Sequence, residues 1–176
     1  MGMASVARKQ SGHPWVLVLD DDPIAARAMA RAVSSVTGAR VALVFDVDSA
    51  LRLAMRASEP PAAAILDFEL GGGTTGLLVL QRLRASGFEA PCAFHTGAPG
   101  AAASALASSR LSGTYPVFDK GDNEGSLVSW VTGLVGAEAS AHRSGTRRKV
   151  VADSGAATQA GSPHESRAGR YKGRSR

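Results

Sequence analysis

A chain of 176 residues is long enough for one α/β domain with a tail, and its single cysteine excludes a disulfide-stapled fold. The longest early apolar run, residues 15–19, is too short for a signal peptide or a membrane span, so we expect a cytoplasmic protein. The net charge of +5 is unevenly distributed. Residues 1–136 hold 11 Lys/Arg and 12 Asp/Glu, whereas residues 137–176 hold 9 and 3.

The leader, residues 1–13, is small, polar and aperiodic, which predicts disorder. Five short apolar runs then follow, and a helical pattern comes after each of them. Strict alternation of this kind implies a parallel sheet with helices on both faces. The predicted strands cover residues 15–19, 39–45, 62–66, 92–95 and 115–119.

The helix boundaries carry their own signals. Pro23 suits a first helical turn, and Gly38 suits the cap at the end of that helix. The second helix has Asp48 or Ser49 as its expected N-cap. The expected buried stripe of the first helix is Ile24, Ala28, Val33 and Val36, and that of the last helix is Leu127, Val128, Trp130, Val131 and Leu134.

Polar side chains stand where the predicted strands end. Asp20, Asp21 and Asp22 follow the first strand, and Asp67 ends the third. Because α/β sheets place their ligands at the carboxyl ends of the strands, we expect these groups to meet. Thr96 follows the fourth strand and Lys120 the fifth. Carboxylates, a hydroxyl and an amine together predict a phosphoryl and metal site.

The tail, residues 137–176, is rich in Ala, Ser, Gly and Arg, and we predict a basic disordered segment. A solvated extension is the favoured interpretation. Salt-sensitive contact with nucleic acid or an acidic partner is the next, since Arg147, Arg148 and Lys149 cluster without interleaved aromatic residues. No amphipathic apolar face accompanies the charge, which argues against a membrane role.

Together these residues resemble the receiver domain of bacterial two-component response regulators, of the stand-alone, single-domain type. The resemblance covers residues 14–136. Its motifs in chain order are Val-Leu-Val-Leu-Asp20-Asp21-Asp22-Pro23, Ile-Leu-Asp67, Phe-His-Thr96-Gly97 and Phe-Asp-Lys120. It implies a flavodoxin-like, doubly wound, five-stranded parallel sheet in the order 2-1-3-4-5. The bottom-up prediction of alternating strands and helices agrees with that fold.

The resemblance also implies roles for the strand-end residues. Asp67 is the implied phosphoacceptor, charged by a sensor histidine kinase or a histidine phosphotransfer protein of a phosphorelay. The implied Mg²⁺ ligands are Asp21 directly, Asp20 through a water, Asp67, and the main-chain carbonyl of Glu69, with Mn²⁺ as the alternative ion. Thr96 and Lys120 would bind the phosphoryl group. The protein would be no conventional enzyme, although it would carry intrinsic self-phosphorylation and dephosphorylation chemistry.

Several positions depart from the family pattern. The loop from Gly71 to Gly76 is one residue longer than usual and lacks a proline, and Gly121 stands where proline usually follows the lysine. Val117 occupies the place of the aromatic switch residue, for which Tyr115 is a candidate substitute two positions earlier. Signalling would pass to an unknown downstream protein, from a monomer or a phosphorylation-linked homodimer.

Two other functions stay open at this point. A pseudo-receiver would keep the fold and bind a partner without being phosphorylated, and the Val117 and Gly121 departures favour it. A haloacid-dehalogenase-like phosphatase would use Asp20 as nucleophile and Asp122 as its last acid. That interpretation leaves Asp67 unexplained, and Pro23 begins a helix where a flap should follow.

Overall fold

The computed structural model describes residues 13–122 and 124–154. The chain divides into two units, residues 1–143 and 144–176, and the sheet lies entirely in the first. The expected leader, residues 1–13, lies outside the described residues except for His13. Among the residues described, no helix is both long enough and apolar enough to cross a lipid bilayer.

Five parallel strands form the central sheet, in the order β2-β1-β3-β6-β7. This is the predicted order 2-1-3-4-5, because β4 and β5 form a separate two-stranded hairpin in the loop after β3. The strands are β1 (Trp15–Leu19), β2 (Arg40–Val44), β3 (Ala63–Leu66), β4 (Glu69–Leu70), β5 (Thr74–Thr75), β6 (Cys92–Thr96) and β7 (Val117–Asp119). β7 begins two residues later than predicted.

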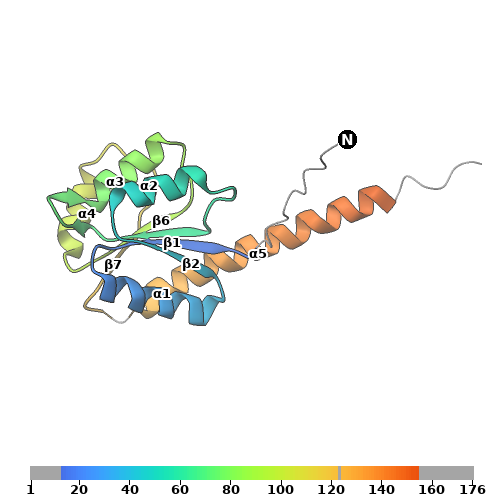
Figure 1. The fold of residues 1–176 in the computed structure, drawn as a ribbon, viewed down its shortest axis with the longest axis horizontal. Helices are drawn as coiled ribbons and strands as arrows, with labels where there is room; N and C mark the ends of the chain where they lie inside the picture. Colours follow the sequence, from blue (N-terminus) through green and yellow to red (C-terminus); the bar gives the residue numbers. More distant parts are fainter. Residues whose placement is uncertain (1–12, 123, 155–176) are drawn as a thin grey trace, which may run out of the picture. The chain divides into compact units, whose positions relative to one another are not determined.

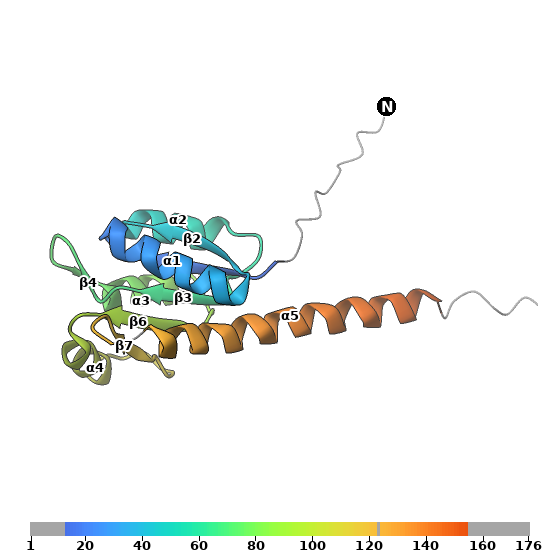
Figure 2. The same ribbon diagram turned by 90° about the horizontal axis from the view of Figure 1, so that it is seen from below.

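The helices cover both faces of the sheet, as Figures 1 and 2 show. α2, α3 and α4 lie on one face, and α1 with the first turns of α5 lies on the other. Alternate residues of β1 point to the two faces of the sheet. Leu17 packs into the hydrophobic core under α2, α3 and α4, and Val16 packs into the core under α1 and α5. The helices are α1 (Pro23–Thr37), α2 (Val47–Arg56), α3 (Gly76–Ala85), α4 (Pro99–Ala107) and α5 (Gly125–Ser154).

α1 begins and ends as predicted but buries a different stripe. Asp22 caps its N-terminus, and Gly38 adopts the left-handed conformation at its end with φ of 67°. Met29 and Val33 are buried, whereas Ile24 is 77% exposed and Val36 61% exposed. The predicted stripe was therefore wrong at both of its ends, and Ala26, Met29 and Val33 mark the face that packs on the sheet. Ile24 points away from that face, because residues two positions apart in an α-helix lie on nearly opposite sides.

Two further boundaries differ from the predictions. Asp46, rather than Asp48 or Ser49, caps α2 by accepting a hydrogen bond from the Ser49 main-chain nitrogen at 2.8 Å. α5 buries Leu127 and Val131 as expected and continues to Ser154, past residue 136 where the disordered tail was expected to begin. Alanine and arginine are frequent after residue 136 and favour helix. The rest of the expected tail, residues 155–176, lies outside the described residues.

Candidate functional site

The ends of β1 and β3 lie side by side at the carboxyl edge of the sheet. Asp20 follows β1 and Asp67 follows β3, and these two strands pair with one another. The Asp67 main-chain nitrogen donates to the Leu19 carbonyl at 2.8 Å. Oxygen atoms of Asp20, Asp21 and Asp67 all lie within 4.8 Å of one another. Asp20 and Asp67 are buried and Asp21 is exposed, so the cluster has one face open to solvent.

Lys120 connects the two buried carboxylates. Its Nζ lies 2.8 Å from Asp20 Oδ2 and 2.9 Å from Asp67 Oδ2. Its main-chain nitrogen donates to the Thr96 carbonyl at 2.9 Å, and the next nitrogen, of Gly121, donates to Asp119 Oδ1 at 2.8 Å. These bonds extend the β6–β7 pairing by one residue and fix Lys120 without a following proline.

The burial of these charges perturbs their protonation. Desolvation raises the pKa of Asp67 above its usual value, the hydrogen bond and charge of Lys120 oppose that rise, and the charge of Asp20 adds to it. Desolvation acts to lower the pKa of Lys120, but the hydrogen bonds to Asp20 and Asp67 outweigh it and the net shift is upward. Lys120 is therefore protonated near neutral pH, whereas burial makes ionisation of Asp67 less favourable than in water.

The three consecutive aspartates perform three different tasks. Asp20 Oδ1 accepts a hydrogen bond from the Asp22 main-chain nitrogen at 3.0 Å and turns inward toward Lys120. Asp21 Oδ2 accepts from the Gly71 main-chain nitrogen at 2.8 Å, which ties the end of β1 to the loop after β3. Asp22 Oδ1 accepts from the Ile24 nitrogen at 2.8 Å and caps α1. Capping and clustering thus both occur, on different residues.

The glycine-rich loop after β3 holds the site together in ways that the sequence analysis did not predict. Gly72 and Gly73 have positive φ angles in the β4–β5 hairpin turn. A Cβ at Gly76 would lie 2.1 Å from the Asp67 carbonyl oxygen, so no side chain fits there without displacing the Asp67 main chain. A Cβ at Gly71 would lie 3.0 Å from Asp21 Oδ2. The only sequence signal was the density of glycine after a strand-end aspartate.

The other predicted site residues take varied positions. Thr96 is fully buried at the end of β6, and its Oγ1 accepts from the Ala98 nitrogen at 3.1 Å. Glu69 is exposed, and its main-chain nitrogen donates to Asp67 Oδ1 at 3.2 Å. Val117 pairs with Phe94 across β6 and β7 and is half-buried.

Tyr115 lies two residues before β7 and packs on the same core cluster as Val117. Its hydroxyl donates to the Ser112 carbonyl at 2.9 Å and accepts from Arg84 Nε at 3.4 Å. The Arg84 guanidinium also lies 5.6 Å from the centroid of the Tyr115 ring. Tyr115 is therefore held on three counts and is not a freely rotating side chain in this conformation.

Arg84 is a structural centre that the sequence analysis missed. In addition to Tyr115, it donates to the carbonyls of Phe88 and Ala90 and to Cys92 Sγ. Burial raises the pKa of the Cys92 thiol to about 11, against a smaller lowering by Arg84, so that thiol stays protonated near neutral pH. An arginine in the last turn of a helix has no sequence signature for such a role.

His95 lies on the opposite face of β6 from Phe94 and Thr96. It is buried, and its Nε2 has no hydrogen-bond partner among the described residues. Desolvation and the charge of Lys120 lower the pKa of His95, against opposing contributions from Asp20 and Asp119. The imidazole is therefore neutral near pH 7, consistent with a packed neighbour of the site.

The donor set at this edge fits a small hard cation. Three carboxylates lie within reach of one point, one of them faces solvent, and no soft ligand is among them. Mg²⁺ and Mn²⁺ prefer oxygen donors, and Mg²⁺ keeps several waters, which a sparse open cluster permits. Lys120 supplies a positive charge at 2.9 Å from Asp67.

Solved structures with the same fold are response regulator receiver domains. A response regulator receiver protein from Burkholderia phymatum is 29% identical, with a TM-score of 0.55 over 70% of this chain and 95% of its own. The receiver domain of Francisella response regulator 1452 is 21% identical, with a TM-score of 0.57 over 70% and 98%. A receiver domain protein from Clostridium thermocellum is 15% identical, with a TM-score of 0.58 over 71% and 96%.

The chain therefore has the fold of response regulator receiver domains, as the motif resemblance implied. The two structures below 25% identity are similar in fold alone. No protein-family model matches the sequence, and no curated protein matches it. The similarity that the comparisons show thus lies in the three-dimensional arrangement.

Proposed function

We propose that this protein is a phospho-accepting receiver that takes a phosphoryl group on Asp67. The observation that carries the proposal is the position of the Asp67 carboxylate, which ends β3 beside Asp20 and Asp21 and lies 2.9 Å from Lys120 Nζ. A nucleophilic carboxylate, an acidic cluster and a fixed cation form the set that phosphoryl transfer to aspartate requires. In this function the protein accepts and loses phosphate without turning over a substrate of its own.

The chemistry is a displacement at phosphorus. A carboxylate oxygen of Asp67 attacks the phosphorus of a phosphohistidine on the partner, the P–N bond breaks, and the histidine nitrogen leaves with the electron pair and is protonated. Asp67 then carries an acyl phosphate, which water hydrolyses to the carboxylate and inorganic phosphate. Lys120 offsets the charge that gathers on the phosphoryl oxygens, and Thr96 is the proposed hydrogen-bond donor to one of them.

Mg²⁺ is the proposed metal, held by Asp21 and Asp67, by Asp20 through a water and by the main-chain carbonyl of Glu69. Bound there, it would neutralise part of the carboxylate charge and of the incoming phosphoryl charge. The raised pKa of Asp67 fits this requirement, because the ionised carboxylate needs a cation to be stable. Asp22, which is occupied as the α1 cap, is not part of the proposed ligand set.

The proposed partners are a sensor histidine kinase or histidine phosphotransfer protein upstream and a protein of unidentified class downstream. Phosphorylation would draw Lys120 and Thr96 toward the phosphoryl group and shift the loops after β6 and β7 between two populations. Arg84 holds Tyr115 at the amino end of β7, the end opposite to these loops.

Intact-mass spectrometry after incubation with acetyl phosphate and Mg²⁺ tests the proposal. The wild type should gain one phosphoryl group, and Asp67→Asn should gain none. Asp22→Asn is the matched control, since asparagine also caps helices and the residue lies in the same acidic run. It should be phosphorylated like the wild type. Chelation with EDTA should abolish the adduct in every variant.

The same experiment separates the two alternatives. Absence of an adduct on the wild type under Mg²⁺-saturated conditions would establish a pseudo-receiver. An adduct that survives Asp67→Asn and disappears in Asp20→Asn would establish the phosphatase-like use of Asp20. In the structure α1 begins at Pro23, directly after the aspartates, which leaves no room for the flap that such a phosphatase needs.

A further inference from the structure

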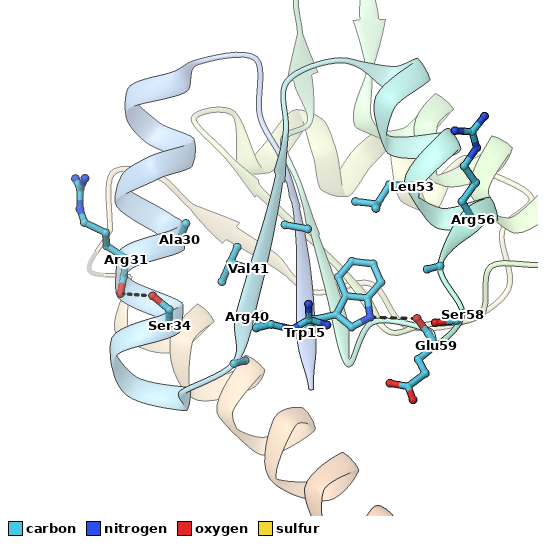
Figure 3. A pocket seen from close by; sticks show the side chains of 13 residues that line it. Trp15, Ala30, Arg31, Ser34, Arg40, Val41, Leu53, Arg56, Ser58 and Glu59 are labelled. Carbon is cyan, nitrogen blue, oxygen red and sulfur yellow. Dashed lines mark hydrogen bonds between the residues drawn. The ribbon is translucent and has the colours of Figure 1, made fainter. Parts of the chain in front are cut away.

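A second site candidate is the open groove around strand β2, shown in Figure 3. The groove has a volume of about 730 Å³ and is lined by residues of α1, β2, α2 and the segment after α2. Trp15 and Arg40, which line it, are the first residues of β1 and β2. The groove therefore lies toward the amino ends of these strands, whereas Asp20 and Asp67 follow the carboxyl ends.

β2 is an edge strand of the sheet and has main-chain groups to offer. The Arg40 nitrogen donates inward to the Pro14 carbonyl, and the Val44 carbonyl accepts from the Asp20 nitrogen. In a parallel pair the strand residues alternate in direction, so residues 40, 42 and 44 bond to β1 and the peptide groups of Val41 and Leu43 face outward. An edge of this kind is a template for an added strand.

The side chains beside this edge form two walls. Figure 3 shows Ala30, Arg31 and Ser34 of α1 on one side of β2, and Leu53, Arg56 and the Trp15 indole on the other. The Trp15 indole is fixed, because its Nε1 donates to the Glu59 carbonyl at 3.1 Å. A strand added to β2 would point alternate side chains to the two sides, where each wall offers apolar surface with an arginine at its rim.

The charge of the groove is strongly one-sided. Arg31, Arg40 and Arg56 line it against the single carboxylate of Glu59. All three arginines are exposed, and no carboxylate among the described residues lies within 4.0 Å of their guanidinium groups. Surface arginines on an edge strand also serve to discourage aggregation, but that need does not require apolar walls or the flanking arginines on α1 and α2.

We propose that β2 docks an extended acidic segment of a partner protein by strand addition. The partner's main chain pairs with the outward-facing peptide groups of Val41 and Leu43. Its glutamate or aspartate side chains meet Arg31, Arg40 and Arg56, and its apolar side chains contact Leu53, Val41 and the Trp15 ring. This surface is separate from the carboxylate site, so docking there does not depend on phosphorylation of Asp67.

The test uses the full chain and a blocked seven-residue peptide of alternating glutamate and valine, followed by amide-resolved NMR titration. Shift changes should concentrate at residues 39–43 and 53–59 and at the Trp15 indole, and the Val41 and Leu43 amides should become protected from hydrogen exchange. The same peptide with an N-methyl group on every residue keeps its charge but has no N–H to donate from either edge, and it should bind at least tenfold more weakly.

Variants of the protein test the two parts of the proposal. Val41→Pro removes an outward N–H without touching the inward ladder, which edge strands tolerate, and should weaken binding about tenfold. Arg31→Glu combined with Arg40→Glu should abolish measurable binding, whereas Arg82→Glu on α3 and Asp67→Asn should leave it unchanged.

The outcomes decide the matter either way. A peptide with lysine in place of each glutamate serves as the charge control. The proposal is overturned if this peptide binds as well as the glutamate–valine peptide, or if the N-methylated and unmodified peptides bind equally. It is also overturned if the NMR shift changes map to the basic segment after residue 137. Should Val41→Pro fail to fold, the N-methylated peptide still tests main-chain pairing on the wild-type protein.

Discussion

A half-buried cation lies at each end of the β6–β7 strand pair, and the two cations contact different kinds of partner. At the carboxyl end Lys120 touches two carboxylates and lies next to a cluster that fits a metal ion. At the amino end Arg84 donates to two carbonyls, a thiol and a hydroxyl and has no carboxylate partner in the described part of the chain. Lysine is a point charge that can exchange one oxygen for another, whereas the planar guanidinium holds several fixed acceptors at once.

This difference shows which end of the domain is built for exchange and which for rigidity. The partners of Lys120 are charged groups, whose interactions would change on the proposed phosphorylation or metal binding. The partners of Arg84 are neutral groups of the main chain and of Cys92 and Tyr115, and they have nothing to exchange with. The four predictions that follow test this contrast.

Replacing Arg84 should have the largest effect on stability. Arg84→Met leaves two carbonyls and the Tyr115 hydroxyl without their donor, and we expect a loss of about 3 kcal/mol in the free energy of unfolding. Chemical denaturation measures it, and addition of Mg²⁺ should not restore the loss. Arg82→Met, at an exposed position on the same helix, is the matched control and should change stability by less than about 0.5 kcal/mol. Equal effects at the two positions would contradict the structural role of Arg84.

Adding a side chain at Gly76 should have the second largest effect on stability. Gly76→Ala places a methyl group where the Asp67 carbonyl lies, so the Asp67 main chain has to move, and overpacking of this kind costs about 1–3 kcal/mol. Phosphorylation by acetyl phosphate should fall together with stability. Gly133→Ala in α5, where a Cβ meets nothing within 4 Å, should keep full phosphorylation and retain or raise stability. Normal phosphorylation of Gly76→Ala would show that Asp67 does not depend on this close approach.

Removing the lysine should have a smaller effect that depends on metal. Lys120→Met leaves Asp20 and Asp67 facing one another without a cation, and we expect a loss of about 1 kcal/mol in EDTA. Saturating Mg²⁺ should recover most of that loss, since binding to the native state alone stabilises it. Thermal unfolding of both variants with and without Mg²⁺ compares the two ends directly. The contrast would be contradicted if Mg²⁺ restored the stability of Arg84→Met, or if Mg²⁺ failed to restore the stability of Lys120→Met.

The smallest effect should be a change in pH dependence. Because the pKa of Asp67 is raised in the folded state, the folded protein holds this proton more tightly than the unfolded chain, so stability falls as pH rises from about 3.8 through the folded-state pKa. Asp67→Asn cannot ionise and should therefore be more stable than the wild type at pH 7 in EDTA. The difference should shrink as the pH is lowered through that window. A constant difference at every pH would show that ionisation of Asp67 is not its cause.

Much of the fold followed from local patterns. The alternation of apolar runs and helical segments predicted the parallel sheet, the family resemblance implied its strand order, and Pro23 and Gly38 marked both ends of α1. The strand-end residues Asp20, Asp67 and Lys120 were expected at one edge, and the structure places them within ion-pair distance. The buried stripe of α1 was wrong at Ile24 and Val36, because apolar residues occur on more than one side of this helix and hydrophobicity alone does not show which side meets the sheet.

The sequence by itself determined the class of fold and the edge at which the carboxylates meet. Local patterns locate each strand and the residue that follows it, and parallel strands bring their carboxyl ends to one edge of the sheet. Tertiary structure decided what depends on distant loops closing together. The Gly71–Asp21 hydrogen bond joins residues 50 positions apart, and Arg84 reaches Tyr115 across 31. The ion pair of Asp20 and the loop contact of Asp21 result from the same closure, whereas Asp22 caps α1 through a local contact. The physical reason is that each of these contacts is selected by packing in three dimensions, for which spacing along the chain carries no signal.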